Sequence, residues 1–111
     1  MRKMRKFLAV ALAMTLAGVA GAADLEAGKK KAAEVCAACH GPEGNKPLDP
    51  TQPVLAGQHE DYLARALTDY KIGRRNNPIM KGFASQLSKK EIEDLAAWFA
   101  RQKSNLHDQR Q

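Results

Sequence analysis

Two cysteines three positions apart, with a histidine directly after the second, constrain this chain more than any other feature of its sequence. They are Cys36, Cys39 and His40. Residues three apart on a helical turn share a face, so both sulfur atoms can reach the two vinyl groups along one edge of a porphyrin. The adjacent imidazole can then bind the iron. Because this spacing is the attachment signature of c-type haem, we predict one covalent haem with His40 as an iron ligand.

Three other uses of a cysteine pair explain less of the sequence. A redox dithiol of the thioredoxin kind needs a βαβ setting, and the chain has no strand-like alternation of useful length. A structural zinc site needs two further ligands at suitable spacing, and two cysteines with scattered histidines provide no evident set. A simple disulfide suits an oxidising compartment, but it leaves the adjacent histidine unexplained.

The N-terminal segment, residues 1–23, has the organisation of a secretory signal peptide. A basic stretch over residues 1–6 precedes an uncharged, mostly apolar run from Phe7 to Ala20, and small residues follow to Ala23. A membrane-spanning helix needs roughly 20 apolar residues, more than this run provides, so cleavage is favoured over an uncleaved anchor. We therefore expect a cleaved signal over residues 1–23, export to the periplasm and no stable membrane insertion. The haem domain is expected over residues 24–111.

The predicted mature chain is nearly neutral and poor in large apolar side chains. The whole chain has 18 Lys and Arg against 12 Asp and Glu, a net charge of +6, but four basic residues lie in the signal. No block of Lys and Arg is interleaved with aromatics, so nucleic-acid binding has little support. The mature part contains only Phe83, Trp98 and Phe99 as Phe or Trp side chains. A domain this small often needs an additional stabilising group beyond its own apolar core, and a buried porphyrin would supply one.

Three segments have the end signals of helices, and the second and third also have an apolar stripe at helical spacing. The last is the best marked, because Ser88 and Glu91 are spaced as a capping box ahead of an apolar stripe. Beyond about Gln102 the chain is polar, and we expect a tail over residues 104–111. The three helices are expected over residues 25–38, 59–72 and 89–102.

Gly28 lies in the middle of the first expected helix, where glycine costs up to about 1 kcal/mol relative to alanine. A helix tolerates this where another backbone must come close. We therefore expect a second helix to cross the first near Gly28. The alternative is a weak spot in an exposed helix.

The segment between the first two helices, residues 41–58, is rich in Gly, Pro, Asn and Asp, which are turn formers. A loop of this length inside a compact domain usually serves a function. We expect it to enclose one side of the haem. Within it, Pro53 lacks a backbone N–H but keeps its carbonyl free to accept a hydrogen bond.

Met80 is the only methionine outside the predicted signal peptide, and it lies shortly after Pro78 in a segment for which we predict a loop. A thioether suits haem iron and raises its reduction potential relative to two histidine ligands, so Met80 is the predicted second axial ligand. The alternative is the commonest role of methionine, filling a gap in the core. His59 and His107 are further candidate ligands, but their positions are more typical of solvated surface histidines.

Four segments, taken in order, resemble the class I c-type cytochromes, specifically the small bacterial periplasmic monohaem kind and one half of their dihaem relatives. The segments are Val35 to Gly41, Pro53 to Gln58, Asn77 to Met80, and Asp94 to Phe99. The resemblance covers essentially all of the mature chain. It implies an all-α cytochrome c fold, with about three main helices and long loops around one haem c.

The resemblance also implies a role for each site residue. Cys36 and Cys39 carry the thioether bonds to the haem. His40 is the proximal iron ligand and Met80 the distal one. The carbonyl of Pro53 accepts a hydrogen bond from the other ring nitrogen of His40, a contact that fixes the ring and tunes the iron.

At the helix crossing, the resemblance implies that Gly28 is the small residue where the terminal helices of the family meet, with Trp98 or Phe99 packed nearby. Ala32 departs from the family, because many relatives carry an aromatic residue at this position of the interface. The crossing is therefore expected to be packed more by Trp98.

The predicted function is one-electron transfer between periplasmic redox proteins. A six-coordinate iron has no open position for a substrate, so we predict a carrier and not an enzyme. Its donor and acceptor, among them membrane respiratory complexes, are expected to dock at the exposed haem edge. One alternative is a haem subunit of a larger dehydrogenase or oxidoreductase complex, and another is a five-coordinate haem that binds a gas. Six basic residues are candidates for the docking rim, although each is individually more typical of a solvated charge: Lys46, Arg74, Arg75, Lys81, Lys89 and Lys90.

Overall fold

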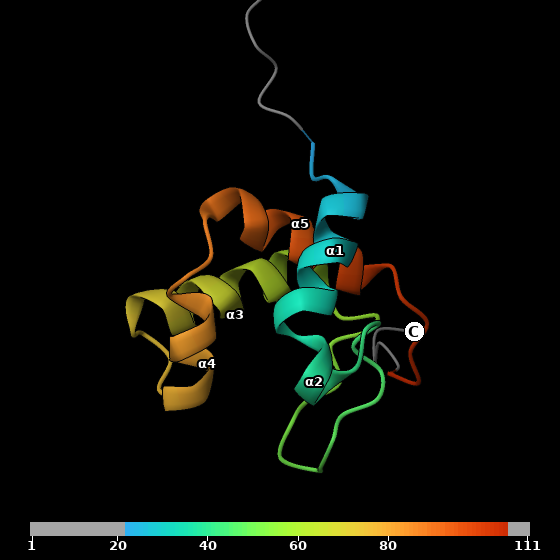
Figure 1. Ribbon diagram of the computed structural model, residues 1–111, viewed down its shortest axis with the longest axis horizontal. Coiled ribbons are helices and arrows are strands. Elements are labelled where there is room, and N and C mark those ends of the chain that lie inside the picture. The colour runs from blue at the N-terminus through green and yellow to red at the C-terminus, as the bar shows by residue number, and fades with distance from the viewer. Residues whose placement is uncertain (1–21, 107–111) are drawn as a thin grey trace, which may run out of the picture.

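The computed structural model describes residues 22–106, and this part of the chain contains helices and loops without a strand (Figure 1). Five helices follow one another: α1 Leu25–Val35, α2 Ala37–His40, α3 Glu60–Ile72, α4 Pro78–Ala84 and α5 Lys89–Ala100. The predicted all-α fold is confirmed, with α1, α3 and α5 as the three main helices. The predicted signal peptide falls outside the described residues except for its last two positions, and His107 also lies outside them.

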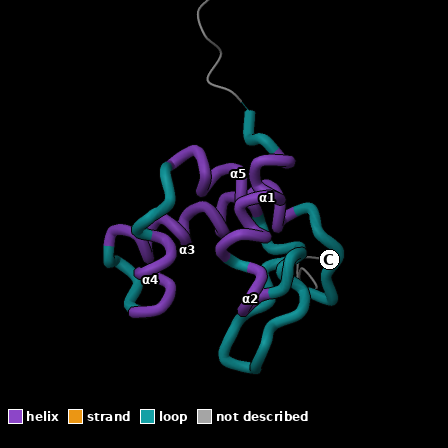
Figure 2. Tube along the Cα trace, viewed as in Figure 1, coloured by secondary structure: helices purple, strands orange, loops and turns teal. Residues whose placement is uncertain are grey.

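Figure 2 shows how much of the molecule is loop, above all the long connection between α2 and α3. In the view of Figure 1, α1 crosses α5 while α3 runs behind them, and α2 and α4 lie below. Within residues 22–106, no helix combines the length and the apolar character that crossing a bilayer requires.

The crossing of α1 and α5 confirms the prediction made for Gly28. A Cβ atom built on Gly28 would lie 2.2 Å from the carbonyl oxygen of Asp94 and 3.0 Å from the Cβ atom of Trp98. Only a hydrogen atom fits between the two helices at this point. Ala32, one turn further along α1, is completely buried, and Trp98 packs against the same core cluster.

The core is built largely by α5. The predicted apolar stripe of Ile92, Leu95, Ala96 and Phe99 is buried, and it meets Leu63 of α3. Such a stripe, recurring every three or four residues, is what anchors an amphipathic helix. α1, α3 and α5 therefore form the scaffold of the fold.

Two expectations about helices need correction. The first expected helix, residues 25–38, is divided: α1 ends at Val35, and α2 begins after Cys36 and continues through His40. The segment around Met80, expected as a loop, is the helix α4. A helix as short as α4 cannot show an apolar period. Only its end signals could have predicted it, namely an asparagine at the N-cap and a proline at the first helical position.

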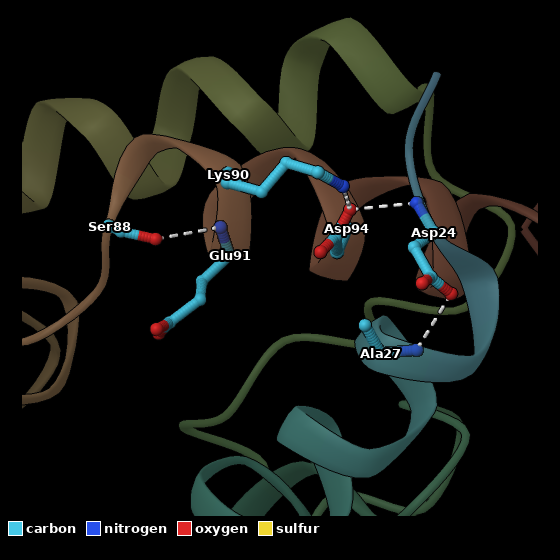
Figure 3. A network of polar contacts seen from close by, with 6 residues as sticks. All are labelled: Asp24, Ala27, Ser88, Lys90, Glu91 and Asp94. Carbon is cyan, nitrogen blue, oxygen red and sulfur yellow. Dashed lines mark hydrogen bonds and ion pairs between the residues drawn. The ribbon is translucent and has the colours of Figure 1, made fainter. Parts of the chain in front are cut away.

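A buried carboxylate ties the start of α1 to α5 (Figure 3). Asp94 is only 5% exposed, and its Oδ1 accepts hydrogen bonds from the backbone N–H of Asp24 at 2.8 Å and from Lys90 Nζ at 2.5 Å. The side chain of Asp24 in turn caps α1 by accepting from the N–H of Ala27 at 3.0 Å. Burial by itself raises the pKa of Asp94, but the hydrogen bonds from Lys90 and Asp24 outweigh it, so this pKa lies below its ordinary value.

Of the predicted capping box of α5, the hydrogen bond to the serine side chain is present. Ser88 Oγ accepts a hydrogen bond from the backbone N–H of Glu91 at 3.1 Å (Figure 3). The carboxylate of Glu91 lies 3.6 Å from Lys31 Nζ of α1. The start of α5 is thus held by its own cap and by a charge on the crossing helix.

Replacing Asp94 by Asn is expected to lower the free energy of unfolding near neutral pH by about 1–2 kcal/mol, because two hydrogen bonds lose their charged acceptor. Since the folded pKa of Asp94 is lowered, its contribution is complete above the unfolded pKa of about 4. It is lost as the pH falls through the folded pKa. Denaturant unfolding followed at a series of pH values from neutral to acid measures the difference between wild type and variant.

The matched control for this prediction is Glu93→Gln, which removes a neighbouring charge whose side chain is 44% exposed. Its effect is expected to stay within about 0.5 kcal/mol, as is usual for exposed ion pairs. A difference between Asp94→Asn and wild type that does not shrink toward acid pH would contradict the role assigned to this carboxylate.

Candidate haem site

The cysteine pair lies on the junction between α1 and α2. Both cysteines are half-buried and neither forms a disulfide. The carbonyl of Cys36 accepts hydrogen bonds from the N–H groups of Cys39 at 3.3 Å and His40 at 3.0 Å. This helical turn keeps the two thiols on one side of the chain, which is the arrangement that attachment along one porphyrin edge needs.

The surroundings of the cysteines disfavour the other uses considered for them. Burial raises the pKa of the Cys36 thiol to about 11, whereas a reactive dithiol needs a lowered pKa. Within residues 22–106, no group of three or more His, Cys, Asp or Glu side chains is placed to hold a metal ion. The zinc interpretation therefore finds no ligand set in this part of the chain.

His40 ends α2 and is only 6% exposed. Its Nδ1 lies 2.9 Å from the carbonyl oxygen of Pro53. A carbonyl oxygen can only accept, so Nδ1 must carry the proton of this hydrogen bond. In the neutral ring, the lone pair is then on Nε2, the nitrogen that a metal would bind.

The long loop is folded back so that Pro53 reaches His40. The carbonyl of Gly44 accepts from the N–H groups of Leu55 at 2.8 Å and Ala56 at 3.1 Å. Gly44 has φ +74°, and a Cβ atom there would lie 2.7 Å from the ring of Phe99 on α5. Gly44 therefore combines a left-handed backbone with a close approach, both of which only glycine tolerates. Sequence reasoning missed this role, because the partner ring lies in the last helix, far from Gly44 along the chain.

Trp98 supports the loop from a second side. Its indole Nε1 donates a hydrogen bond to the carbonyl of Pro42 at 3.2 Å, and the ammonium of Lys29 lies 5.8 Å from the ring centroid. Pro42 follows closely after His40. Through Trp98 and Phe99, the terminal helix α5 thus contacts the loop at both Pro42 and Gly44.

Met80 lies in the first turn of α4 and is half-buried. The helix α4 packs against α3. His59 is an exposed residue at the N-cap of α3. In Figure 1, α4 lies on the same lower side of the molecule as α2, which carries His40.

These residues together fit a covalently held haem. Two half-buried thiols lie on one helical turn, and the histidine after them has its Nδ1 committed to a carbonyl at 2.9 Å. A thioether is available on a separate helix, α4. Thiol, imidazole and thioether are the donor set that haem attachment and soft axial ligation of iron require.

Comparison with known proteins agrees with this geometry. Residues 25–103 match the cytochrome c family. The chain is 46% identical over 105 residues to cytochrome c4 of Pseudomonas aeruginosa, covering 93% of this chain and 51% of that protein. It is 38% identical over 100 residues to the thiosulfate dehydrogenase electron acceptor of Thiomonas intermedia, covering 90% of this chain and 45% of that protein.

A solved structure shows the same architecture. The crystal structure of reduced recombinant cytochrome c4 from Pseudomonas stutzeri superposes with a TM-score of 0.69 at 42% identity, covering 77% of this chain and 48% of that one. The chain thus spans about half the length of each of these three proteins. The matched residues include every helix and the cysteine pair, and the chain therefore belongs to the cytochrome c family and carries covalently bound haem c.

Proposed function

We propose that the protein is a one-electron carrier of the periplasm whose haem iron is held between His40 and Met80. The observation that carries this proposal is the placement of His40. Its ring is buried, and its Nδ1 donates to the carbonyl of Pro53 at 2.9 Å. Such a contact orients the imidazole, fixes its tautomer and strengthens Nε2 as a ligand.

Each remaining site residue has a part in the proposed mechanism. Cys36 and Cys39 would hold the haem by thioether bonds, and Met80 would hold its iron together with His40. A bound haem provides an iron that cycles between the ferrous and ferric states. A thioether ligand favours the ferrous state and so raises the potential. An iron held by both His40 and Met80 would have no open position for a substrate, which supports a carrier and not an enzyme.

The proposed location rests on the sequence of residues 1–23. Their basic start, apolar run and small residues have the order of a secretory signal peptide. We propose that residues 1–23 are removed on export and that residues 24–111 form the cytochrome domain, with residues 104–111 as its polar tail.

The proposed partners are redox proteins that donate and accept the electron. The name of one relative, a thiosulfate dehydrogenase electron acceptor, supports a redox enzyme as the class of donor. Arg75 and Lys81 are exposed just before and on α4 and suit an acidic partner surface. Arg74 is exposed beside them, with its guanidinium 3.5 Å from Asp69. Lys90 is less suited to docking, because its ammonium is bonded to Asp94. The same name is also compatible with the alternative of a haem subunit in a larger complex.

A potentiometric titration followed by absorption spectra tests the proposal. We expect one reversible one-electron transition, haem that stays with the denatured chain, and the weak far-red band of a ferric iron–thioether bond. Absence of that band at neutral pH, with carbon monoxide binding to the ferrous protein, would instead favour the five-coordinate alternative. Copurification of a second polypeptide would favour the subunit alternative.

A further inference from the structure

The backbone of Met80 is held by the side chain of Asn77, which lies just before it in the chain. Asn77 is the N-cap of α4, in an extended conformation with φ −153° and ψ 111°. Its Oδ1 accepts hydrogen bonds from the N–H groups of Ile79 and Met80, each at 3.1 Å. Pro78, which lies between Asn77 and Ile79 in sequence, has no N–H that would need a partner. One amide oxygen therefore satisfies both donors at the start of this helix.

Few side chains of α4 are buried, although the helix packs against α3. Among its side chains only Ala84, the last residue of the helix, is buried, and Ile79 is 69% exposed. Segments with few buried apolar contacts open locally at low free energy. The first turn of α4 lies at the opposite end of the helix from Ala84, so the contacts of its N-cap contribute to its position.

A second polar contact closes the far end of the same segment. Lys71 Nζ, near the end of α3, donates a hydrogen bond to the carbonyl of Leu87, just before α5. This contact joins the two ends of the connection that contains α4. It limits how far the connection moves as a whole, but it leaves the first turn of α4 to its own cap.

We propose that Asn77 is a positioning residue for Met80, which places the thioether by capping the turn that carries it. The inference rests on the proposed ligation of iron by Met80. Without the cap, the N–H groups of Ile79 and Met80 lose their acceptor and the first turn frays. Because Met80 lies in that turn, the sulfur atom is displaced while the core formed by α1, α3 and α5 stays intact.

The test compares imidazole binding to the ferric holoprotein in three variants. Asn77→Ala is expected to bind imidazole roughly fivefold more tightly than wild type, the equilibrium factor that corresponds to loss of a typical N-cap. Its far-red band should also disappear at a lower temperature. Asn77→Asp keeps an acceptor oxygen and should behave like wild type. Ser88→Ala is the matched control, because it removes the cap of α5: it should lower the global unfolding temperature and leave imidazole affinity unchanged.

Two outcomes would overturn the inference. One is an imidazole affinity of Asn77→Ala equal to that of wild type, and the other is an equal gain in Ser88→Ala, which would make the effect one of global stability. If Asn77→Ala does not fold, Asn77→Gly removes the same oxygen at a smaller cost to the helix and takes its place, with an expected gain in affinity of roughly twofold. Absence of the far-red band in wild type would be a different failure, since it would remove the proposed ligation by Met80 itself.

Discussion

Met80→Ala is expected to leave the haem attached and to lower its midpoint potential by on the order of a hundred millivolts or more, within the roughly 0.8 V range that axial ligands set. The reason is that a thioether stabilises the ferrous state more than water or a nitrogen ligand does. The variant should also lose the far-red band and bind imidazole or carbon monoxide. Potentiometric titration of wild type and variant measures the shift.

Ile79→Ala is the matched control for this substitution. Ile79 is the neighbour of Met80 on α4 and is 69% exposed, so its truncation removes apolar atoms from the same helix without touching the thioether. Its midpoint potential should stay close to that of wild type. A midpoint of Met80→Ala equal to that of wild type would make Met80 a packing residue and not a ligand.

Gly28→Ala is expected to destabilise the protein by about 2 kcal/mol or more, since overpacking of this kind typically costs about 1–3 kcal/mol and occasionally exceeds that range. The new Cβ atom would lie 2.2 Å from the oxygen and 2.7 Å from the carbon of the Asp94 carbonyl. This is backbone, which cannot rotate away, so α5 must shift. The gain in helix propensity of about 1 kcal/mol does not offset a clash with a second helix. Denaturant unfolding of the holoprotein measures the loss.

Gly82→Ala is the matched substitution for which we expect a gain in stability instead of a loss. Gly82 lies inside α4, and a Cβ atom built on it meets nothing within 4 Å. The substitution should therefore stabilise the protein by about 0.5–1 kcal/mol, because alanine loses less backbone entropy than glycine on folding. Equal stability of Gly28→Ala and wild type would show that α1 and α5 can separate at no cost, against the geometry of the crossing.

Local signals in the sequence predicted those features of the fold that depend on residues within one or two helical turns. The spacing of Cys36 and Cys39 places both on one turn, and the capping residue Ser88 marks the start of α5. Gly28 is the exception, because this residue also predicted a contact between distant segments of the chain. Glycine has a low helix propensity, which is tolerated inside a helix where another backbone comes close. The unfavourable propensity of one residue therefore predicted a contact between two helices far apart in the chain.

The errors have a common physical cause. The helix at Met80 is too short to show a period, and α1 is interrupted at Cys36 although the residues around it favour a continuous helix. Single residues decide both places: Asn77 and Pro78 set the start of α4, and at Cys36 the backbone interrupts the helix without a side-chain cap. Propensity averaged over a window does not report either influence.

The chemistry of the site is already present in the sequence: a cysteine pair with its histidine, one thioether in the predicted mature chain, and helices with clear ends. How these groups are held depends on the folded arrangement. The carbonyl of Pro53 meets His40 because Gly44 lets the loop fold against Phe99, and Asp94 is buried because α1 lies on it. Such contacts join residues far apart in the chain, and they form only after packing has offset the entropy of closing the loops between them.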